Sequence, residues 1–504
     1  MRAALRKART AVVLIVFIIA MVIPVTGGGM ALDKRKKLVD GSDKKTIETA
    51  ADQGDSAYPL RTKPKTITEY KRKIYNDAGK VVDVPEDLGM SYDVYYDKEW
   101  SSAILRSIIG PCYYVDRELN FKLLCSRNTC AAISFDGEAV VYGQSENGGE
   151  SALYWYDVEK DKSYKVMTGY VNSATLSPNG KKAAFVRYDD ENPSVFVAEK
   201  DTKPEPVTRG DYDVISVSDE GEIICSKNLG KFYSFSDGQE TAIGEAGSAN
   251  QYCLNNKCTQ FMFVGKNEKN VYYYEFGMDG SKMVYEGGAG TLKPGACHVR
   301  QSNCSSSLHQ DIYDTESLQG TVFYGTKLTP YMFHGVDKEI EQFPGRSTVY
   351  TISDGEEYTV MVAQSSVENK TVTVKKYRDG VCFDEKVIDG ISKESVACDE
   401  RGRCFYIVDD FGTLYRYEDD ELKEIDKNAK AGGNDGMKVN ALDSLLYYRK
   451  GVDLYVIGDE FGPAVVAGNC QSLTTSMGTE YSVFYYDMSS KTHALIFGNN
   501  IEPY

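Results

Sequence analysis

Short apolar runs separated by polar turns recur along the chain from about residue 131 to its end. The clearest copy covers residues 174–208, where an apolar run closes on Ser177-Pro178-Asn179-Gly180, a tight turn in which glycine tolerates positive φ. Further strands are predicted over residues 183–187 and 194–199, and a fourth begins at Pro206. This alternation predicts a four-stranded antiparallel meander.

Turns of the same kind recur at intervals of about 43 residues. They are Asp136-Gly137, Asn179-Gly180, Glu220-Gly221, Asn255-Asn256, Asp354-Gly355, Arg401-Gly402, Asp443-Ser444 and Met477-Gly478. A sheet of four short strands cannot bury both of its faces alone, so the copies must stack on one another like the blades of a β-propeller. The sequence therefore predicts an all-β fold, a single propeller of four-stranded blades over residues 91–504, with eight blades favoured within a range of seven to nine.

Both ends of the propeller region contain incomplete units. Strands are predicted over residues 91–97, 104–109, 112–116 and 121–125, before the first full unit, and a partial unit covers residues 473–498. We expect the two ends to complete one blade together, which closes the ring and removes two exposed sheet edges. The irregular stretch 287–318 is predicted to be an insertion, and inserted loops often provide specificity.

The repeat also resembles a known family. The segment LSPNGKKAAFVR, followed by SVFVAEKD and PVT, is similar to the repeat of TolB-like propellers, which also occurs in the propeller domain of dipeptidyl-peptidase-type enzymes. The match is good over residues 174–208, fair over 131–168 and 214–243, and skeletal elsewhere. The resemblance implies a fold more than an activity, because members serve as docking platforms, as gating domains of peptidases and, in a few cases, as lyases.

The amino-terminal residues predict an address outside the cytoplasm. Residues 1–10 are basic, residues 11–25 form an apolar run, and Gly29-Met30-Ala31 resembles a cleavage site, so residues 1–31 are predicted to be a signal peptide or an uncleaved membrane anchor. Residues 32–90 are basic and are predicted to be a flexible tether. The remainder is acidic, within a net charge of −16 for the whole chain, which disfavours nucleic acid as a partner.

The chain has twelve cysteines, which in a secreted or cell-surface protein is typical of disulfides. Spacing and the proposed closure predict five pairs: Cys125/Cys130, Cys253/Cys258, Cys297/Cys304, Cys398/Cys404 and Cys112/Cys470. Cys253/Cys258 and Cys398/Cys404 flank equivalent turns of two blades, where opposed strand residues come close enough for a disulfide. Cys225 and Cys382 are predicted to be buried thiols. The alternative for the C-x4-C pairs is a four-thiolate zinc site.

Candidate binding residues gather in the predicted loops. They are Asp189, Asp190, Glu191, His298, His309, Asp409 and Asp410. The two histidines share the insertion and could bind a metal, and the clustered carboxylates could bind Ca²⁺, although no D-x-D-x-D-G spacing accompanies them. The ordinary interpretation is solvated loops, and no cofactor is expected. Consecutive tyrosines such as Tyr272-Tyr273-Tyr274 could stack on sugars, but packing between sheets is the favoured interpretation.

Catalytic signatures are mostly absent. The sequence contains no G-x-S-x-G, no H-E-x-x-H and no hydrolase domain after the last repeat. These observations favour a secreted or surface-tethered, non-enzymatic propeller that binds another macromolecule, an extracellular or cell-envelope protein first and a cell-surface glycan second, with membrane contact only through the amino-terminal segment. The alternative is an extracellular polysaccharide lyase or glycoside hydrolase whose carboxylates and tyrosines converge on the central channel.

Overall fold

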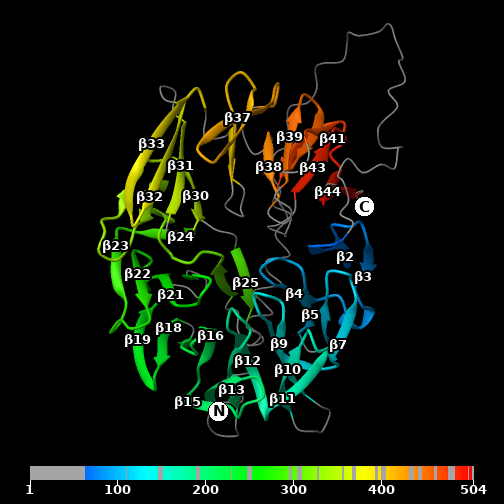
Figure 1. Ribbon diagram of the computed structural model, residues 1–504, viewed down its shortest axis with the longest axis vertical. Coiled ribbons are helices and arrows are strands. Elements are labelled where there is room, and N and C mark those ends of the chain that lie inside the picture. Colours follow the sequence, from blue (N-terminus) through cyan, green and yellow to red (C-terminus); the bar gives the residue numbers. More distant parts are fainter. Residues whose placement is uncertain are drawn as a thin grey trace, which may run out of the picture. The chain divides into compact units, whose positions relative to one another are not determined.

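The computed structural model describes residues 63–501 apart from short gaps at 109, 146–150, 189–192, 229, 247–251, 294–297, 303–308, 326–327, 355–356, 366–369, 392–394, 399–403, 431–435, 441–444, 459–461, 475–482 and 498. Strands provide nearly all of its regular structure (Figure 1). Within these residues, no helix has the length and apolar character needed to cross a membrane.

The described chain begins with a small sheet in the region predicted to be a tether. β1 (Ile67–Tyr70), β2 (Lys73–Asn76) and β3 (Val81–Asp83) pair in an antiparallel meander, and a 3-10 turn (Glu86–Leu88) follows. Ile67 and Ile74 are fully buried in a cluster with apolar side chains of the next sheet. The prediction of a flexible tether is therefore wrong for residues 67–88, because two buried isoleucines anchor this segment; residues 32–62 lie outside the described residues.

Ten antiparallel meanders follow, each with four strands that pair in chain order. The first five are β4 (Tyr92–Tyr96), β5 (Ala103–Ser107), β6 (Cys112–Val115) and β7 (Phe121–Cys125); β8 (Asn128–Ile133), β9 (Ala139–Gln144), β10 (Ala152–Asp157) and β11 (Lys162–Thr168); β12 (Tyr170–Leu176), β13 (Lys182–Tyr188), β14 (Pro193–Glu199) and β15 (Glu205–Arg209); β16 (Asp213–Val217), β17 (Ile223–Lys227), β18 (Lys231–Ser236) and β19 (Gln239–Glu245); and β20 (Tyr252–Leu254), β21 (Gln260–Val264), β22 (Asn270–Glu275) and β23 (Lys282–Glu286).

The other five complete the chain, and an inserted hairpin interrupts the first of them. They are β24 (Ala289–Lys293), β27 (Thr321–Gly325), β28 (Pro330–Phe333) and β29 (Glu341–Gln342); β30 (Thr348–Asp354), β31 (Glu357–Ser365), β32 (Lys370–Arg378) and β33 (Val381–Asp389); β34 (Val396–Cys398), β35 (Phe405–Val408), β36 (Leu414–Glu418) and β37 (Glu421–Asp426); β38 (Met437–Val439), β39 (Leu446–Lys450), β40 (Asp453–Ile457) and β41 (Ala464–Ala467); and β42 (Cys470–Thr474), β43 (Val483–Asp487), β44 (Thr492–Ile496) and β45 (Asn499–Ile501). This succession of four-stranded blades confirms the predicted all-β propeller fold.

A recurring side-chain turn explains why the repeat folds this way. Between β12 and β13, the Ser177 hydroxyl donates to Asn179 Oδ1 (2.9 Å), and Asn179 Oδ1 also accepts the amide of Lys181 (3.0 Å). Gly180 follows at φ 63°, a value that costs glycine nothing. Before β9, the Ser134 hydroxyl donates to Asp136 Oδ1 in the same way, at 2.5 Å. The Ser-x-Asx-Gly pattern is therefore a hairpin turn with its own polar support.

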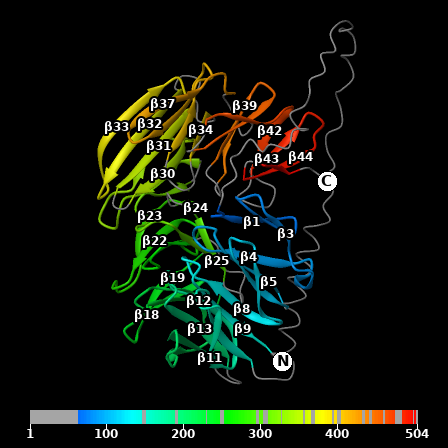
Figure 2. The same ribbon diagram turned by 45° about the vertical axis from the view of Figure 1, so that its right-hand side comes forward.

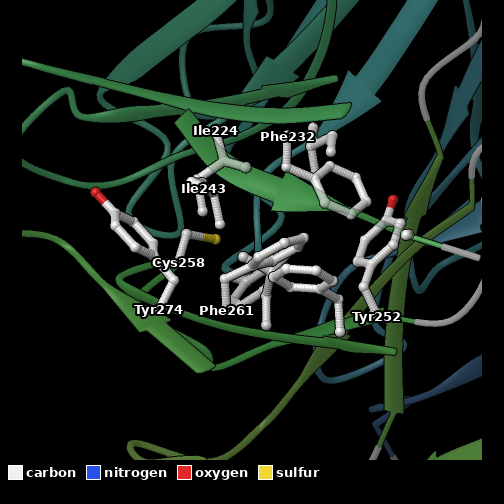
Figure 3. Close-up of a cluster of buried hydrophobic side chains, with 12 residues drawn as sticks. Ile224, Phe232, Ile243, Tyr252, Cys258, Phe261 and Tyr274 are labelled. Carbon is white, nitrogen blue, oxygen red and sulfur yellow. The ribbon is translucent and has the colours of Figure 1, made fainter. Parts of the chain in front are cut away.

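Neighbouring blades pack through apolar side chains, as the stacking argument requires. Phe232 and Ile243 of one blade meet Tyr252, Phe261 and other residues of the next in a single buried cluster (Figure 3). Phe232 makes edge contacts with Phe261 at a centroid separation of 4.9 Å. Such aromatic pairs are worth about 0.5–1.5 kcal/mol beyond the area that they bury.

The tyrosine runs serve the same packing. Tyr273 and Tyr274 are 4% and 2% exposed, and Tyr447 and Tyr448 are fully buried. Tyr272, which is partly buried, stacks on Phe263 at 5.2 Å within the same blade. The packing interpretation is confirmed for these tyrosines.

The number of blades and the closure of the ends differ from the prediction. The described residues form ten four-stranded meanders rather than eight, since β4–β7 and β42–β45 are each complete sheets. The first and last blades share no strand; instead Tyr70 of β1 packs against Phe484 of β43, with ring centroids 5.8 Å apart. The prediction of one blade shared by both ends is therefore wrong, because the small sheet β1–β3 lies between them and provides apolar contacts to both.

The predicted insertion at 287–318 contains an added hairpin. β25 (His298–Ser302) and β26 (His309–Tyr313) pair with each other, and β26 adds to β20 in parallel through Leu254 and Ile312. The hairpin lies beside β4, and an ion pair joins Lys98 Nζ to Asp314 Oδ1 at 3.0 Å. The inserted segment thus connects the fifth meander to the first (Figure 1).

Candidate functional site

The loop carboxylates singled out in the sequence divide into two groups. Asp189, Asp190 and Glu191 lie outside the described residues. Asp409 accepts the amides of Phe411 (2.9 Å) and Thr413 (2.8 Å), so it supports its own turn, and Asp410 pairs with Lys370 at 3.2 Å. In the structure these two carboxylates therefore have local structural roles.

The register of the inserted hairpin separates its two histidines. His298 is opposite Tyr313, and His309 is opposite Ser302. The histidines therefore lie at opposite ends of the hairpin, about 13 Å apart along the strands. Among the described residues, no group of three or more His, Cys, Asp or Glu side chains is placed to hold a metal ion.

Two predicted cysteine pairs have members in different apolar clusters. Cys253 packs in the cluster between β20–β23 and the following meander, whereas Cys258 packs in the cluster on the other side, among Ile243 and Phe261 (Figure 3). In β34–β35, Cys398 is opposite Phe405 and packs with it, whereas Cys404 packs with Tyr406. Cys258 lies in the turn between β20 and β21, and Cys404 lies one residue before Phe405, the register partner of Cys398. The members of each pair therefore pack in different clusters, and the two disulfides stay predictions.

The remaining cysteines form a different arrangement from the predicted one. Cys112 and Cys125 are directly opposed on β6 and β7 and share one buried cluster, whereas Cys470 lies in a cluster of the last two meanders. The pairing of Cys112 with Cys470 is therefore not supported by the fold. Cys225 is a buried thiol, as predicted, but Cys382 is exposed because it lies on the outer strand β33. Cys297 and Cys304 lie outside the described residues.

A dense polar cluster, which we call the Glu341 cluster, lies between β27–β29 and β30–β33. It consists of Glu341, His334, Tyr358, Lys375 and Tyr377. Glu341 Oε2 accepts the Tyr377 hydroxyl at 2.6 Å and lies 3.1 Å from His334 Nε2, and Glu341 Oε1 accepts Lys375 Nζ at 3.0 Å. The Tyr358 hydroxyl lies 2.6 Å from His334 Nδ1. Both ring nitrogens are satisfied when Nε2 donates to Glu341 and Tyr358 donates to Nδ1.

Charge and packing reinforce this cluster. Burial opposes ionisation of Glu341, but hydrogen bonds from His334, Tyr377 and Lys375 hold the pKa of its carboxyl at about 2. Burial, together with the hydrogen bond to Glu341, raises the pKa of Tyr377. The rings of Tyr358 and Tyr377 stack at 5.1 Å with an interplanar angle of 6°. Because the Glu341 oxygens are occupied by donors of this chain, the cluster holds two blades together rather than presenting a base to a substrate.

β33 is the solvent-exposed outer strand of the sheet that supplies Tyr358, Lys375 and Tyr377 to the Glu341 cluster. Cys382 is opposite Tyr377, and Glu385 Oε2 lies 3.6 Å from Lys375 Nζ. β33 has nine residues, and all but Ile388 are exposed. Three of its large apolar side chains are more than half exposed: Val381 (56%), Phe383 (51%) and Val387 (55%). Within its sheet the strand pairs only with β32, so its far edge is not hydrogen-bonded within the sheet (Figure 2).

The other outer strands differ from β33 in length and in exposed apolar surface. In the described part of the chain they have seven residues or fewer. Among those whose side chains are described, each exposes at most one large apolar side chain on its strand, such as Leu123 of β7, Met283 of β23 or Val465 of β41. Folded proteins usually blunt a sheet edge with short strands and charge. β33 carries charged residues but is an exception in its length and its exposed apolar surface. Sequence alternation alone did not identify it, because inner and outer strands of a blade have similar patterns.

Comparison with known proteins adds little to this description. No protein-family model and no curated protein matches the chain. Among solved structures, it is similar to the β-propeller domain of the Trilobed protease from Pyrococcus furiosus, with 12% identity and a TM-score of 0.29 over 64% of this chain and 97% of that one. A prolyl endopeptidase gives 12% identity and a TM-score of 0.31 over 65% of this chain and 54% of that one. At these TM-scores the propeller assignment depends on the sheets themselves.

Proposed function

We propose that this chain is a non-enzymatic propeller scaffold, secreted or tethered at the cell surface, that binds an extended segment of a partner protein by strand addition to β33. The observation that carries the proposal is the nine-residue outer strand with Val381, Phe383 and Val387 more than half exposed. An unpaired edge offers backbone donors and acceptors to an incoming strand, and alternate side chains give it specificity. The resemblance of residues 174–208 to TolB-like repeats, whose members include docking platforms, supports the same interpretation.

The chemistry of β33 defines the partner. Covering each half-exposed apolar side chain contributes about 1 kcal/mol, which favours valine, isoleucine or leucine in the incoming strand. Asp384, Glu385 and Asp389 add three exposed carboxylates to the same strand against one exposed ammonium, that of Lys386, so lysine or arginine in the incoming strand is complementary. The expected partner segment is extended, apolar at some positions and basic at others. The basic and apolar residues at the amino terminus support a location of the propeller outside the cytoplasm.

The test uses a synthetic probe, an end-capped nine-residue peptide of alternating valine and lysine that carries a fluorophore. Fluorescence anisotropy should show binding with a Kd on the order of 10 μM. The same peptide with alternate amides N-methylated should bind at least tenfold more weakly, because those amides can no longer donate to the edge. Phe383→Lys should weaken binding to a similar extent, whereas Val465→Lys on β41 is the matched control and should leave the Kd unchanged.

Three outcomes would overturn the proposal. One is no binding at millimolar peptide, and another is binding that survives both the N-methylation and the Phe383→Lys substitution. The third is a dimer in sedimentation experiments that Phe383→Lys dissociates, because a second copy of the chain would then occupy the edge.

A further inference from the structure

We propose that Cys112 and Cys125 form a disulfide that joins β6 to β7, the third and fourth strands of the β4–β7 meander. Cys112 on β6 and Cys125 on β7 are register partners in an antiparallel pair. The Cβ atoms of directly opposed residues lie about 4.5–5.5 Å apart, close to the separation that a disulfide requires. The two side chains also share one buried cluster, so they are on the same face of the sheet.

The local backbone distinguishes Cys112 and Cys125 from the predicted pairs Cys253/Cys258 and Cys398/Cys404. A register shift between Cys112 and Tyr113 places an extra residue, Leu124, in β7. This bulge brings Cys125 opposite Cys112 at the end of the strand pair. Cys112 is fully buried and Cys125 is 4% exposed. The bond would therefore form during folding and then be shielded from solvent reductants.

Cys130 and Cys470 are less well placed to form a disulfide with Cys112 or Cys125. Cys130 follows on β8 in the next meander, where it is opposite Gly143 and packs in a different cluster, with Trp155. It is near enough to Cys125 to interact electrostatically with it, so it is the third thiol of the region. Cys470 packs among the last two meanders. Spacing favours Cys125 with Cys130, but register favours Cys125 with Cys112.

A buried cation lies beside these thiols. Arg106 is opposite Cys112 on β5, is 5% exposed and has an Nε atom without a hydrogen-bond partner. Burial raises the pKa values of Cys112 and Cys130, and the positive charge of Arg106 acts in the opposite direction on both. A nearby guanidinium stabilises the thiolate, which is the attacking species in thiol–disulfide exchange.

The oxidation requires a disulfide as the co-reactant. One cysteine thiolate attacks a low-molecular-weight disulfide, forms a mixed disulfide and releases one small thiol. The second cysteine then attacks the mixed disulfide and releases the other small thiol. The two protein thiols lose two protons and two electrons, and the co-reactant gains them as two thiols.

Peptide mapping tests this connectivity because trypsin separates the three cysteines. Cleavage after arginine and lysine gives peptides 107–117, 123–127 and 128–160, each with one cysteine, and peptide 451–491 contains Cys470. The full-length chain is refolded with oxidised glutathione, alkylated under denaturing conditions without reductant, digested and analysed by mass spectrometry. We expect 107–117 linked to 123–127, with Cys130 and Cys225 alkylated.

Variants separate the disulfide from a packing role. Cys130→Ser should leave the 107–117/123–127 crosslink intact, whereas Cys112→Ser and Cys125→Ser should each leave the remaining member of the pair alkylated. Wild-type protein should unfold at lower urea after reduction, and reduction should not shift Cys112→Ser. A crosslink of Cys125 to Cys130, a crosslink of Cys112 to Cys470, or complete alkylation of all three thiols after oxidative refolding would overturn the proposal.

Discussion

Two regions of the molecule use different chemistry to hold an outer strand in place. Between β4–β7 and β8–β11, the polar or reactive groups are the thiols of Cys112, Cys125 and Cys130 around a buried arginine. Between β27–β29 and β30–β33, the centre is a carboxylate that binds one ammonium, one imidazole and one phenol. The proposed Cys112–Cys125 disulfide would make one region of the repeat sensitive to oxidation, whereas the Glu341 cluster makes another region sensitive to acid.

Removing the carboxylate should give the largest effect. Glu341→Ala leaves His334, Lys375 and Tyr377 without their common acceptor, and we expect a loss of about 4 kcal/mol in the free energy of unfolding. Urea denaturation followed by circular dichroism measures the change. Asp410→Ala, which removes an exposed ion pair, is the control and should change the free energy by about 0.5 kcal/mol or less. Equal losses in the two variants would contradict the central role of Glu341.

Acid should weaken the same contact. The pKa of Glu341 is about 2 in the folded chain, below its unfolded value of about 4.3. Its contribution is therefore fully present above pH of about 4.3 and is lost as the pH falls toward about 2, by roughly 3 kcal/mol. Urea midpoints measured across this range should fall more steeply for the wild type than for Glu341→Gln. Parallel curves for the two proteins would show that another group governs the acid response.

Oxidation should act on the Cys112–Cys125 pair and not on the Glu341 cluster. A disulfide between Cys112 and Cys125 closes a short loop and should add about 3 kcal/mol relative to the reduced chain. Comparison of urea curves for oxidised and reduced protein measures this increment, and it should vanish in Cys112→Ser and in the double variant with Cys125→Ser alike. An increment that persists in Cys112→Ser would assign it to other cysteines.

Adding a methyl group at Gly143, next to Cys130, should have a smaller effect on the free energy of unfolding. A methyl group on Gly143 would clash with Thr129 Oγ1 and lie 2.8 Å from Cys130 Sγ, so Gly143→Ala should destabilise the chain by about 2 kcal/mol. Gly462→Ala meets no atom within 4 Å and is the matched control. Thermal unfolding of the two variants gives the difference, and similar melting temperatures would mean that the contact adapts without strain.

Changes on the exposed strand itself should have the smallest effect on stability. Val387 is 55% exposed, so Val387→Lys should alter the free energy of unfolding by about 0.5 kcal/mol or less. The same substitution should weaken binding of the valine–lysine peptide. Denaturation and anisotropy measured on one sample separate the two effects. A large loss of stability would mean that β33 is part of the core rather than a docking edge.

Local signals predicted the fold well, whereas signals that depend on register did not. The Ser-x-Asx-Gly turn and the alternation around it involve neighbours in the chain, so they identified the meander at residues 174–208 correctly. Cysteine spacing suggested hairpin clips, but Cys258 lies in the turn after β20 and packs in a different cluster from Cys253. The blade count was wrong because the strands at both ends of the propeller region, β4–β7 and β42–β45, each complete a sheet by themselves.

Almost no pattern in the sequence predicted the candidate site. His334 and Glu341 come from the end of one blade, and Tyr358, Lys375 and Tyr377 come from two strands of the next. No motif links these positions, because the contacts depend on how two sheets face each other. The exposure of Val381–Asp389 also depends on which strand of the blade lies outermost, a property of the assembled sheet rather than of nine residues.

The inserted hairpin β25–β26 has a consequence for synthesis of the chain. It joins the fifth meander to the first through β20 and the Lys98–Asp314 ion pair, two points far apart in sequence. The ribosome must therefore release Asp314 before this bridge can close, while the earlier meanders can form as they emerge. The amino-terminal meanders therefore lack this bridge until β26 and Asp314 have been synthesised. A translational pause before Asp314 would lengthen the time that they spend without it.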